Sequence, residues 1–123
     1  MARELTRDEI LAAVDLKTEL VPVPEWGEDA HVRVRAFSLE ARAGYTAPAL
    51  GLTGDERAEK INSFSNARLV AFSLVDPDGS LIFAEGDVER LAKKNPAVID
   101  RIAAAAARVN GIGQAEESAA AKN

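Results

Sequence analysis

Residues 67–91 read ARLVAFSLVDPDGSLIFAEGDVERL and combine the densest apolar run of the chain with its clearest turn signal. The part before the turn is almost uninterrupted in its apolar character, which predicts burial on most of its sides. In the DPDG sequence at 76–79, aspartate suits the first turn position, proline the second, and glycine a position with positive φ. We therefore expect a tight reversal that returns residues 81–83 to the same core. Residues 72–75 either end a helix or pair as a strand with 81–83.

Capped helices are expected on both sides of this stretch. The TGDE sequence at 53–56 forms a capping box, and apolar residues then recur at steps of three or four, interrupted by Arg68. This pattern predicts a long helix from about residue 55 to about residue 73. On the other side, Asp87 is expected to cap a short helix that stops near Asn95.

The last helix is expected to begin after Asn95, an N-cap residue followed by a first-turn proline, and to end at Gly111 in the left-handed conformation. The alanines at 103–107 combine high helix propensity with small side chains, so they permit close approach of another helix. We therefore regard this alanine face as a candidate partner-binding surface. The apolar stripe of the helix consists of Val98, Ile102, Ala105 and Val109, and the candidate partner-binding residues among them are Ala105 and Val109.

A short N-terminal helix is predicted from Arg7, because Thr6 and Glu9 form a further capping box. Its apolar residues Ile10, Leu11 and Val14 lie at helical spacing. A helix of this length is marginal in water without tertiary contacts. We therefore expect these residues to dock one face of the helix.

A β-hairpin is predicted between residues 18 and 36. Pro22 and Pro24 exclude a helix and remove amide donors from the same side of the chain, so that side must be a sheet edge. Residues 30–36 alternate apolar and polar side chains, as in a strand with one wet face. The connecting loop presents Trp26, the sole tryptophan. Trp26 is either a partner-binding residue, as large aromatic rings at interfaces often are, or a ring folded back on the hairpin.

Together these elements predict an α+β fold. We expect a mainly helical single domain over residues 1–113, with the N-terminal hairpin and, if 72–75 pairs with 81–83, a second short hairpin. Residues 38–52 show no period and are expected to form a partly ordered loop with at most a helical turn at 39–43. The polar segment 114–123 is expected to be a disordered tail.

Composition argues against several classes of function. A net charge of -5 without a clustered basic face does not suit nucleic-acid binding, and no apolar run is long enough to span a bilayer. Without cysteine, a thiolate metal site and a disulfide framework are excluded. Asp76 and Asp78 resemble part of a calcium loop but lack its third ligand, and His31 has no catalytic partner in any motif. We predict no catalytic residue, no cofactor and no metal.

The order of the signals resembles the tail assembly chaperones of long-tailed bacteriophages and prophages. The resemblance covers about residues 4–112 and departs from the family pattern at SLEARAGYTAPAL, where the flanking motifs are expected to lie closer together. Short pieces such as PEWG are not diagnostic, but the ordered series is specific. The series consists of TRDEILAA, VPVPEWG, VRVR, GLTGDER, ARLVAFSLVDPDGSLIF, GDVERL and RVNGI.

The resemblance implies a non-enzymatic role in the host bacterial cytoplasm. Chaperones of this family bind the tape-measure protein during tail morphogenesis, keep its apolar helices soluble and help to recruit tail-tube protein. A homo-oligomer in the form of a ring or spiral would suit a protein that wraps a rod-like client. Two alternatives remain open: a structural subunit of the virion, in the tail or the head-tail connection, and a small enzyme or ligand-binding domain.

Overall fold

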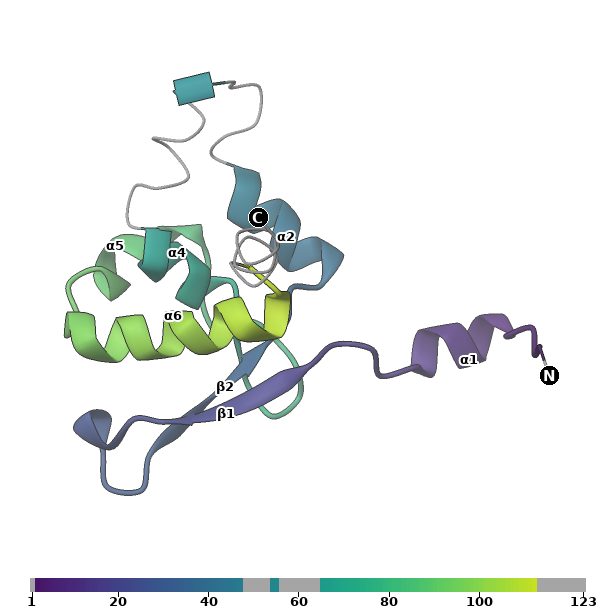
Figure 1. The fold of residues 1–123 in the computed structure, drawn as a ribbon, viewed down its shortest axis with the longest axis horizontal. Coiled ribbons are helices and arrows are strands. Elements are labelled where there is room, and N and C mark those ends of the chain that lie inside the picture. Colours follow the sequence, from purple (N-terminus) through teal and green to yellow (C-terminus); the bar gives the residue numbers. More distant parts are fainter. Residues whose placement is uncertain (1, 48–53, 56–64, 113–123) are drawn as a thin grey trace, which may run out of the picture.

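The computed structural model describes residues 2–47, 54–55 and 65–112, and the fold is α+β, as predicted (Figure 1). Within these residues, a three-stranded antiparallel sheet is covered on one face by helices. The predicted disordered tail at 114–123 lies outside the described residues. The helices are α1 (Arg7–Ala12), α2 (Leu39–Thr46), α4 (Ser65–Ala71), α5 (Val88–Leu91) and α6 (Pro96–Asn110); the strands are β1 (Thr18–Pro22), β2 (His31–Arg35) and β3 (Leu74–Val75).

The predicted N-terminal hairpin is confirmed. β1 pairs antiparallel with β2, with Leu20 opposite Arg33, and the strand order β1-β2-β3 places β1 at the edge of the sheet. The amide of Val23 still donates to the carbonyl of Ala30 (2.9 Å), whereas the flanking prolines Pro22 and Pro24 have no amide to offer the free edge. The two prolines therefore fix which side of β1 is unpaired.

The second hairpin is only partly formed. β3 pairs with β2 rather than with residues 81–83, and the segment after the turn contributes a single bridge between Val75 and Leu81. The intervening turn is as predicted: the amide of Gly79 donates to the carbonyl of Asp76 (2.9 Å), and Gly79 has a φ of 89°. The turn therefore leads the chain away from the sheet after one bridge.

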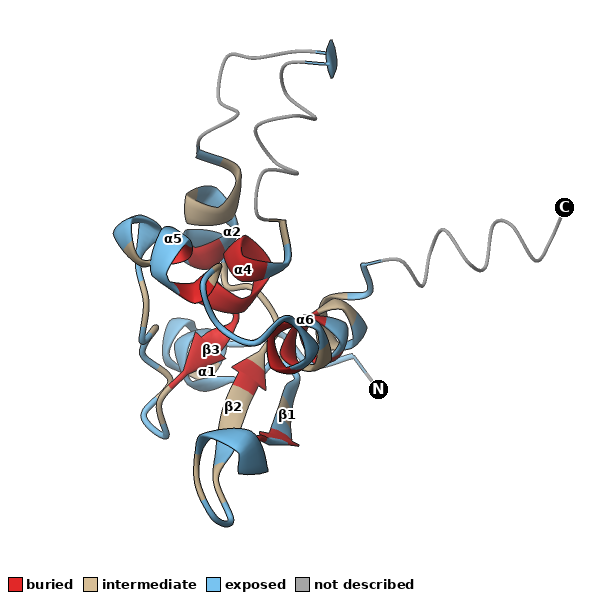
Figure 2. Cartoon of the chain, turned by 90° about the vertical axis from the view of Figure 1, so that its left-hand side faces the viewer, coloured by how far each residue is buried: buried red, intermediate tan, exposed pale blue. Residues whose placement is uncertain are grey.

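The core lies between the inner face of the sheet and the helices α4 and α6 (Figure 2). Successive side chains of a strand point to opposite faces of the sheet. Val32 and Val34, which alternate with Arg33 and Arg35 along β2, therefore face α6. The α4 helix packs along α6 and is buried over most of its length. The fully buried large side chains of the core are Val23, Val34, Val70, Leu74, Val75, Val98 and Ile102.

The long helix expected from residue 55 to residue 73 differs in its described part. α4 is helical over Ser65–Ala71, and Phe72 and Ser73 form a turn into β3; residues 56–64 lie outside the described residues. Arg68, which interrupts the apolar pattern, is nevertheless buried, with 3% of its surface exposed. It donates to the carbonyl oxygens of Gly44 and Tyr45 and to the Glu85 carboxylate, which compensates its burial.

The expectation of a loop over residues 38–52 is wrong for its first half, because α2 spans Leu39–Thr46. Ser38 caps this helix by accepting a hydrogen bond from the amide of Ala41 (3.1 Å). Gly44 was expected to break a helix. It lies inside α2 instead, where its missing side chain leaves room for the Phe72 ring. Residues 48–52 lie outside the described residues.

The caps of α6 are confirmed. Asn95 accepts a hydrogen bond from the amide of Ala97 (2.9 Å), and Gly111 ends the helix with a φ of 70°. Asp87, by contrast, makes no side-chain cap on α5; it accepts a hydrogen bond from the amide of Ala84 (3.0 Å) and so closes the 3-10 turn Glu85–Asp87 that precedes α5. None of the helices in the described ranges is long and apolar enough to cross a membrane.

Candidate interaction surfaces

Trp26 lies in the loop of the hairpin, where the sequence placed it. The loop contains a 3-10 turn, Pro24–Trp26, in which the amide of Trp26 donates to the carbonyl of Val23 (2.9 Å). The indole is neither fully folded back nor fully free, because 39% of the Trp26 surface is exposed. The loop is ordered by its own backbone hydrogen bonds and presents part of a large aromatic ring.

Arg101 of α6 ties this loop to the body of the domain. Its guanidinium donates to both carboxylate oxygens of Glu25, at 2.8 and 2.5 Å, and to the carbonyl oxygen of Pro22 at 3.2 Å. The hydrogen bond from Arg101, followed by one from the backbone of Glu25 itself, lowers the pKa of Glu25 to about 2. A bidentate contact of this kind holds the loop, and with it Trp26, in one orientation.

A groove opens beside Trp26. Its volume is about 340 Å³, and Trp26, Phe83 and Leu91 form its apolar lining. The charged residues Asp87, Arg90 and Lys94 form its rim. The groove therefore joins an aromatic anchor from the hairpin loop to the side of α5, two parts of the chain that are more than 50 residues apart in sequence. Apolar linings with a few charged groups at the edge are typical of sites that take up apolar side chains.

The alanine face of α6 is placed differently from the expectation. Ala105 has no exposed surface and belongs to the core of its own chain, so the prediction of an open surface there is wrong. The helix that the small side chains admit is α4, which packs on α6 within the same molecule. Val109 is half-buried at the margin of this core. A role for Val109 in binding a partner stays a prediction.

The expected docking of α1 is also wrong. The capping box is present, since the Thr6 hydroxyl accepts from the amide of Glu9 and the Glu9 carboxylate accepts from the amide of Thr6. None of the residues of α1 is buried, however, and the helix stands away from the rest of the chain (Figure 1). Ile10, Leu11 and Val14 expose 58%, 69% and 96% of their surfaces. The apolar face of α1 therefore has no cover among the described residues.

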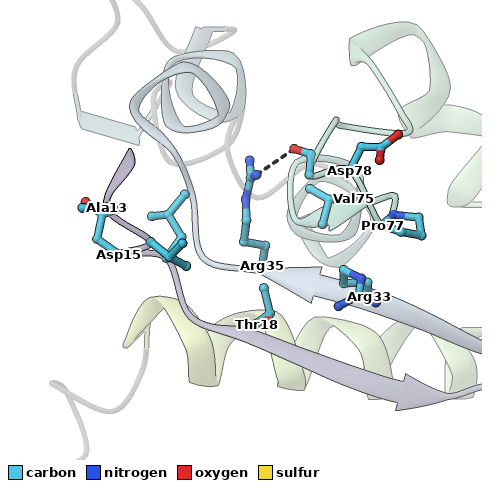
Figure 3. A pocket seen from close by; sticks show the side chains of 11 residues that line it. Ala13, Asp15, Thr18, Arg33, Arg35, Val75, Pro77 and Asp78 are labelled. Carbon is cyan, nitrogen blue, oxygen red and sulfur yellow. Dashed lines mark hydrogen bonds between the residues drawn. The ribbon is translucent and has the colours of Figure 1, made fainter. Parts of the chain in front are cut away.

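The outer face of the sheet carries a second open surface, the arginine face, formed by Leu20, Arg33 and Arg35. Figure 3 shows Arg33 and Arg35 on this face, together with the buried Val75. A cavity of about 410 Å³ lies over it, between residues 13–16 and the turn at 77–79. Arg35 Nη1 donates to the carbonyl of Gly79 (2.7 Å). The Nε atoms of Arg33 and Arg35 are buried without a hydrogen-bond partner in the described part of the chain.

None of the helices that the structure describes covers the arginine face, whereas α4 and α6 cover the inner face of the sheet. Among the described residues, neither Arg33 nor Arg35 has a carboxylate within ion-pair distance, although both guanidinium-bearing side chains are half-buried. Half-buried cations without a counter-charge are unfavourable and are stabilised by an anionic group that approaches them. Leu20, half exposed on the same face, adds an apolar contact point.

The structure places the two remaining candidates of the sequence, the Asp76 turn and His31. Asp76 Oδ1 accepts hydrogen bonds from the amides of Asp78 (2.9 Å) and Ser80 (3.1 Å), which confirms the predicted turn. His31 is an exposed residue at the start of β2. Within the ranges that the structure describes, no group of three or more His, Cys, Asp or Glu residues is arranged to hold a metal ion.

Sequence reasoning found Trp26 but missed the other residues of both surfaces. Phe83, Arg90 and Leu91 join Trp26 only in three dimensions, and no sequence spacing signals this. The arginine face had a signal, because the alternation VRVR places Arg33 and Arg35 on one side of a strand. The sequence reading treated that side as solvent-facing, whereas the turn at 77–79 and residues 13–16 make it a cavity wall.

Comparison with known proteins agrees with the resemblance seen in the sequence. The family model described as phage tail assembly chaperone matches residues 6–123. The fold is similar to that of the bacteriophage HK97 tail assembly chaperone, with a TM-score of 0.57 and 23% identity over 83% of this chain and 94% of that one. No curated protein matches the sequence. Because the family model covers nearly the whole chain, this protein belongs to the phage tail assembly chaperone family.

Proposed function

We propose that this tail assembly chaperone binds the tape-measure protein during tail morphogenesis, keeps its apolar helices soluble and assists the addition of tail-tube protein. The family match over residues 6–123 is the observation that carries the proposal. Assembly takes place in the host cytoplasm in this proposal, and the chaperone acts as a homo-oligomer. The role requires exposed binding surfaces and no catalytic group, cofactor or metal.

The arginine face is the surface that we assign to the client. An antiparallel sheet in an α+β fold commonly packs helices on one face and leaves the other face accessible, so a client can reach the arginine face directly. A client helix laid on this face would contact Leu20 with apolar side chains and place carboxylates near Arg33 and Arg35. Such contacts would supply the counter-charge that both arginines lack among the described residues.

Co-expression with fragments of the tape-measure protein tests the proposal. A fragment that is insoluble alone should be recovered in solution with the chaperone, and light scattering after size-exclusion chromatography should show both chains in one complex. If no fragment along the tape-measure protein is solubilised or bound, tape-measure binding is wrong.

Removal of one charge locates the client surface. Arg33→Gln should lower the recovery of bound fragment, because it removes one positive charge from the client surface. The fold should not be affected, because the Arg33 side chain makes no hydrogen bond within the described chain that the substitution would break. Arg42→Gln is the matched control, since Arg42 is an exposed arginine of α2 outside this face. Equal loss in both variants, or in neither, would show that the client binds elsewhere.

A further inference from the structure

The N-terminal helix α1 is a binding element without a binding site in its own chain. It has 6 residues and no buried side chain. Isolated helices shorter than about 12 residues are marginal in water, so a helix of this length needs a surface to pack on. Leu5, Ile10, Leu11 and Val14 expose between 45% and 96% of their surfaces. A stretch this short with so much exposed apolar surface is typical of an arm that docks on a partner.

The groove beside Trp26 has the properties that this arm requires. Its volume of about 340 Å³ is more than twice that of the ~150 Å³ cavity known to take up a benzene ring, so it can receive more than one aliphatic side chain. Its lining is aromatic and aliphatic, through Trp26, Phe83 and Leu91. Ile10 and Leu11 are adjacent in sequence and offer two side chains to such a lining.

The charges of the two elements are complementary. Residues 2–15 contain two arginines and four carboxylates, a net charge of -2. The rim of the groove carries Arg90 and Lys94 against Asp87, a net charge of +1. Arg90 is well placed to meet an incoming carboxylate, because 84% of its side chain is exposed and its contact with Asp87 is long, at 3.7 Å. Complementary charge at the rim favours the correct orientation of a docked helix.

We propose that α1 of one copy of this protein docks in the Trp26 groove of a second copy. The inference rests on the proposed homo-oligomer and gives it an interface. α1 projects beyond one end of the long axis of the molecule, and the hairpin loop and α5 lie at the other end (Figure 1). In this position α1 is remote from the groove of its own chain. The α1 that fills the groove therefore comes from another molecule.

A one-way contact between α1 of one copy and the groove of the next gives a defined type of assembly. A contact between two different surfaces is heterologous, and it leaves a free α1 at one end and a free groove at the other after every addition. Copies therefore add head to tail, in a ring if the rotation closes and in an open spiral if it does not. A closed twofold dimer would instead require the two copies to exchange their α1 helices reciprocally, and wild-type assemblies that stop at the dimer would show that arrangement in place of head-to-tail growth.

Self-association can be measured on the full chain without any client. Light scattering against concentration should show wild-type assemblies that grow, with a blue shift of the fluorescence of Trp26, the sole tryptophan. Leu11→Gln and Arg90→Glu should each lower the apparent association constant at least tenfold. Neither residue is in the core, since 69% of Leu11 and 84% of the Arg90 side chain are exposed. Leu39→Gln, at an apolar position of α2 that is 73% exposed, is the control and should assemble as wild type.

A mixing experiment separates this interface from any other. In an equimolar mixture, the Arg90→Glu chain supplies an intact α1 and the Leu11→Gln chain an intact groove, so a one-to-one dimer should form and stop there. Growth of the mixture beyond dimers, failure to form dimers, or wild-type assembly by either variant alone would overturn the inference. A wild-type protein that stays monomeric at high concentration would overturn it as well.

Client binding is read separately, which keeps the two proposals distinguishable. If Leu11→Gln blocks assembly and the chain still binds tape-measure fragments through the arginine face, both proposals hold. If self-association follows the expected pattern and no fragment binds, the proposed client is wrong and the interface between copies stands.

Discussion

Arg68 Nη1 lies 2.6 Å from Glu85 Oε2, and the two residues differ greatly in exposure: 4% of the Arg68 side chain and 53% of the Glu85 side chain are accessible. The same guanidinium donates to the carbonyl oxygen of Tyr45 at 2.6 Å. It lies over the rings of Tyr45 and Phe72 at 5.7 and 5.6 Å from their centroids. One buried cation thus joins α2, α4 and the segment that leads into α5.

This unequal burial predicts which partner matters more for stability. Glu85→Ala leaves the buried guanidinium without its counter-charge and should lower the free energy of unfolding by about 3 kcal/mol. Arg68→Met keeps much of the buried volume and leaves an exposed carboxylate that water can solvate, so it should cost less. Urea unfolding of both variants and of the double variant measures the difference. A larger loss for Arg68→Met would show that the carbonyl contacts, rather than the ion pair, dominate.

Glu25 predicts a pH dependence of stability. Its pKa is lowered from 4.5 to about 2 in the folded chain, first by the hydrogen bond from Arg101. A lowered folded-state pKa means that the contact stabilises the fold fully above pH 4.5 and loses its effect as the pH falls toward 2. Glu25→Gln should therefore lower the melting temperature at pH 7, and its difference from wild type should shrink below pH 4.5.

Two controls accompany this measurement. Glu28→Gln changes an exposed carboxylate of the same loop that makes no ion pair in the described part of the chain, and it should show no such trend. Added salt should weaken the Glu25 effect, because the pair lies at the surface. If the difference in melting temperature between wild type and Glu25→Gln stays constant from pH 7 to pH 2, Arg101 does not hold the loop through this carboxylate.

Gly44 predicts a steric effect inside α2. A Cβ atom at this position would lie 2.5 Å from Cε1 of the buried Phe72 ring. Despite the better helix propensity of alanine, Gly44→Ala should therefore destabilise the fold by about 1–3 kcal/mol. Gly86→Ala is the matched control, because nothing lies within 4 Å of a Cβ built there. Thermal unfolding of the two variants tests this, and equal stability of Gly44→Ala and wild type would show that Phe72 can move aside.

The turn after β3 gives a prediction with a control in the same four residues. Asp76→Ala removes the acceptor of two backbone amides and should cost about 1–2 kcal/mol. Asp78→Ala changes an exposed side chain next to it and should be nearly neutral. Chemical denaturation compares them. Equal effects of the two substitutions would mean that the side-chain hydrogen bonds of Asp76 do not stabilise the turn.

Features that depend on neighbouring residues could be predicted from the sequence. Pro22 and Pro24 required an edge strand, and Asn95 and Gly111 marked the ends of α6, because each acts through its own backbone. The sequence could not show what covers an apolar surface. Apolar side chains at helical spacing occur both in α1 and in α6. Those of α1 are exposed, whereas Ala105 of α6 is buried within the chain.

Contacts between distant residues account for the other differences. Arg68 looked like an interruption of an apolar pattern because its partner Glu85 is 17 residues away and belongs to another element. Gly44 looked like a helix breaker because the Phe72 ring that occupies the space beside it is remote in sequence. Of the candidate site, the sequence indicated Trp26 alone, since Phe83, Leu91 and the rim charges meet it only after folding.

The central claim is that the protein binds the tape-measure protein during assembly and is not retained in the tail. Quantitative mass spectrometry of tail precursors and finished particles, taken from the same phage-producing cells, tests it most directly. We predict that the chaperone accompanies the tape-measure protein in precursors and is absent from finished particles. Many copies of the chain in finished particles, with none bound to the tape-measure protein in precursors, would contradict the account and favour a structural subunit.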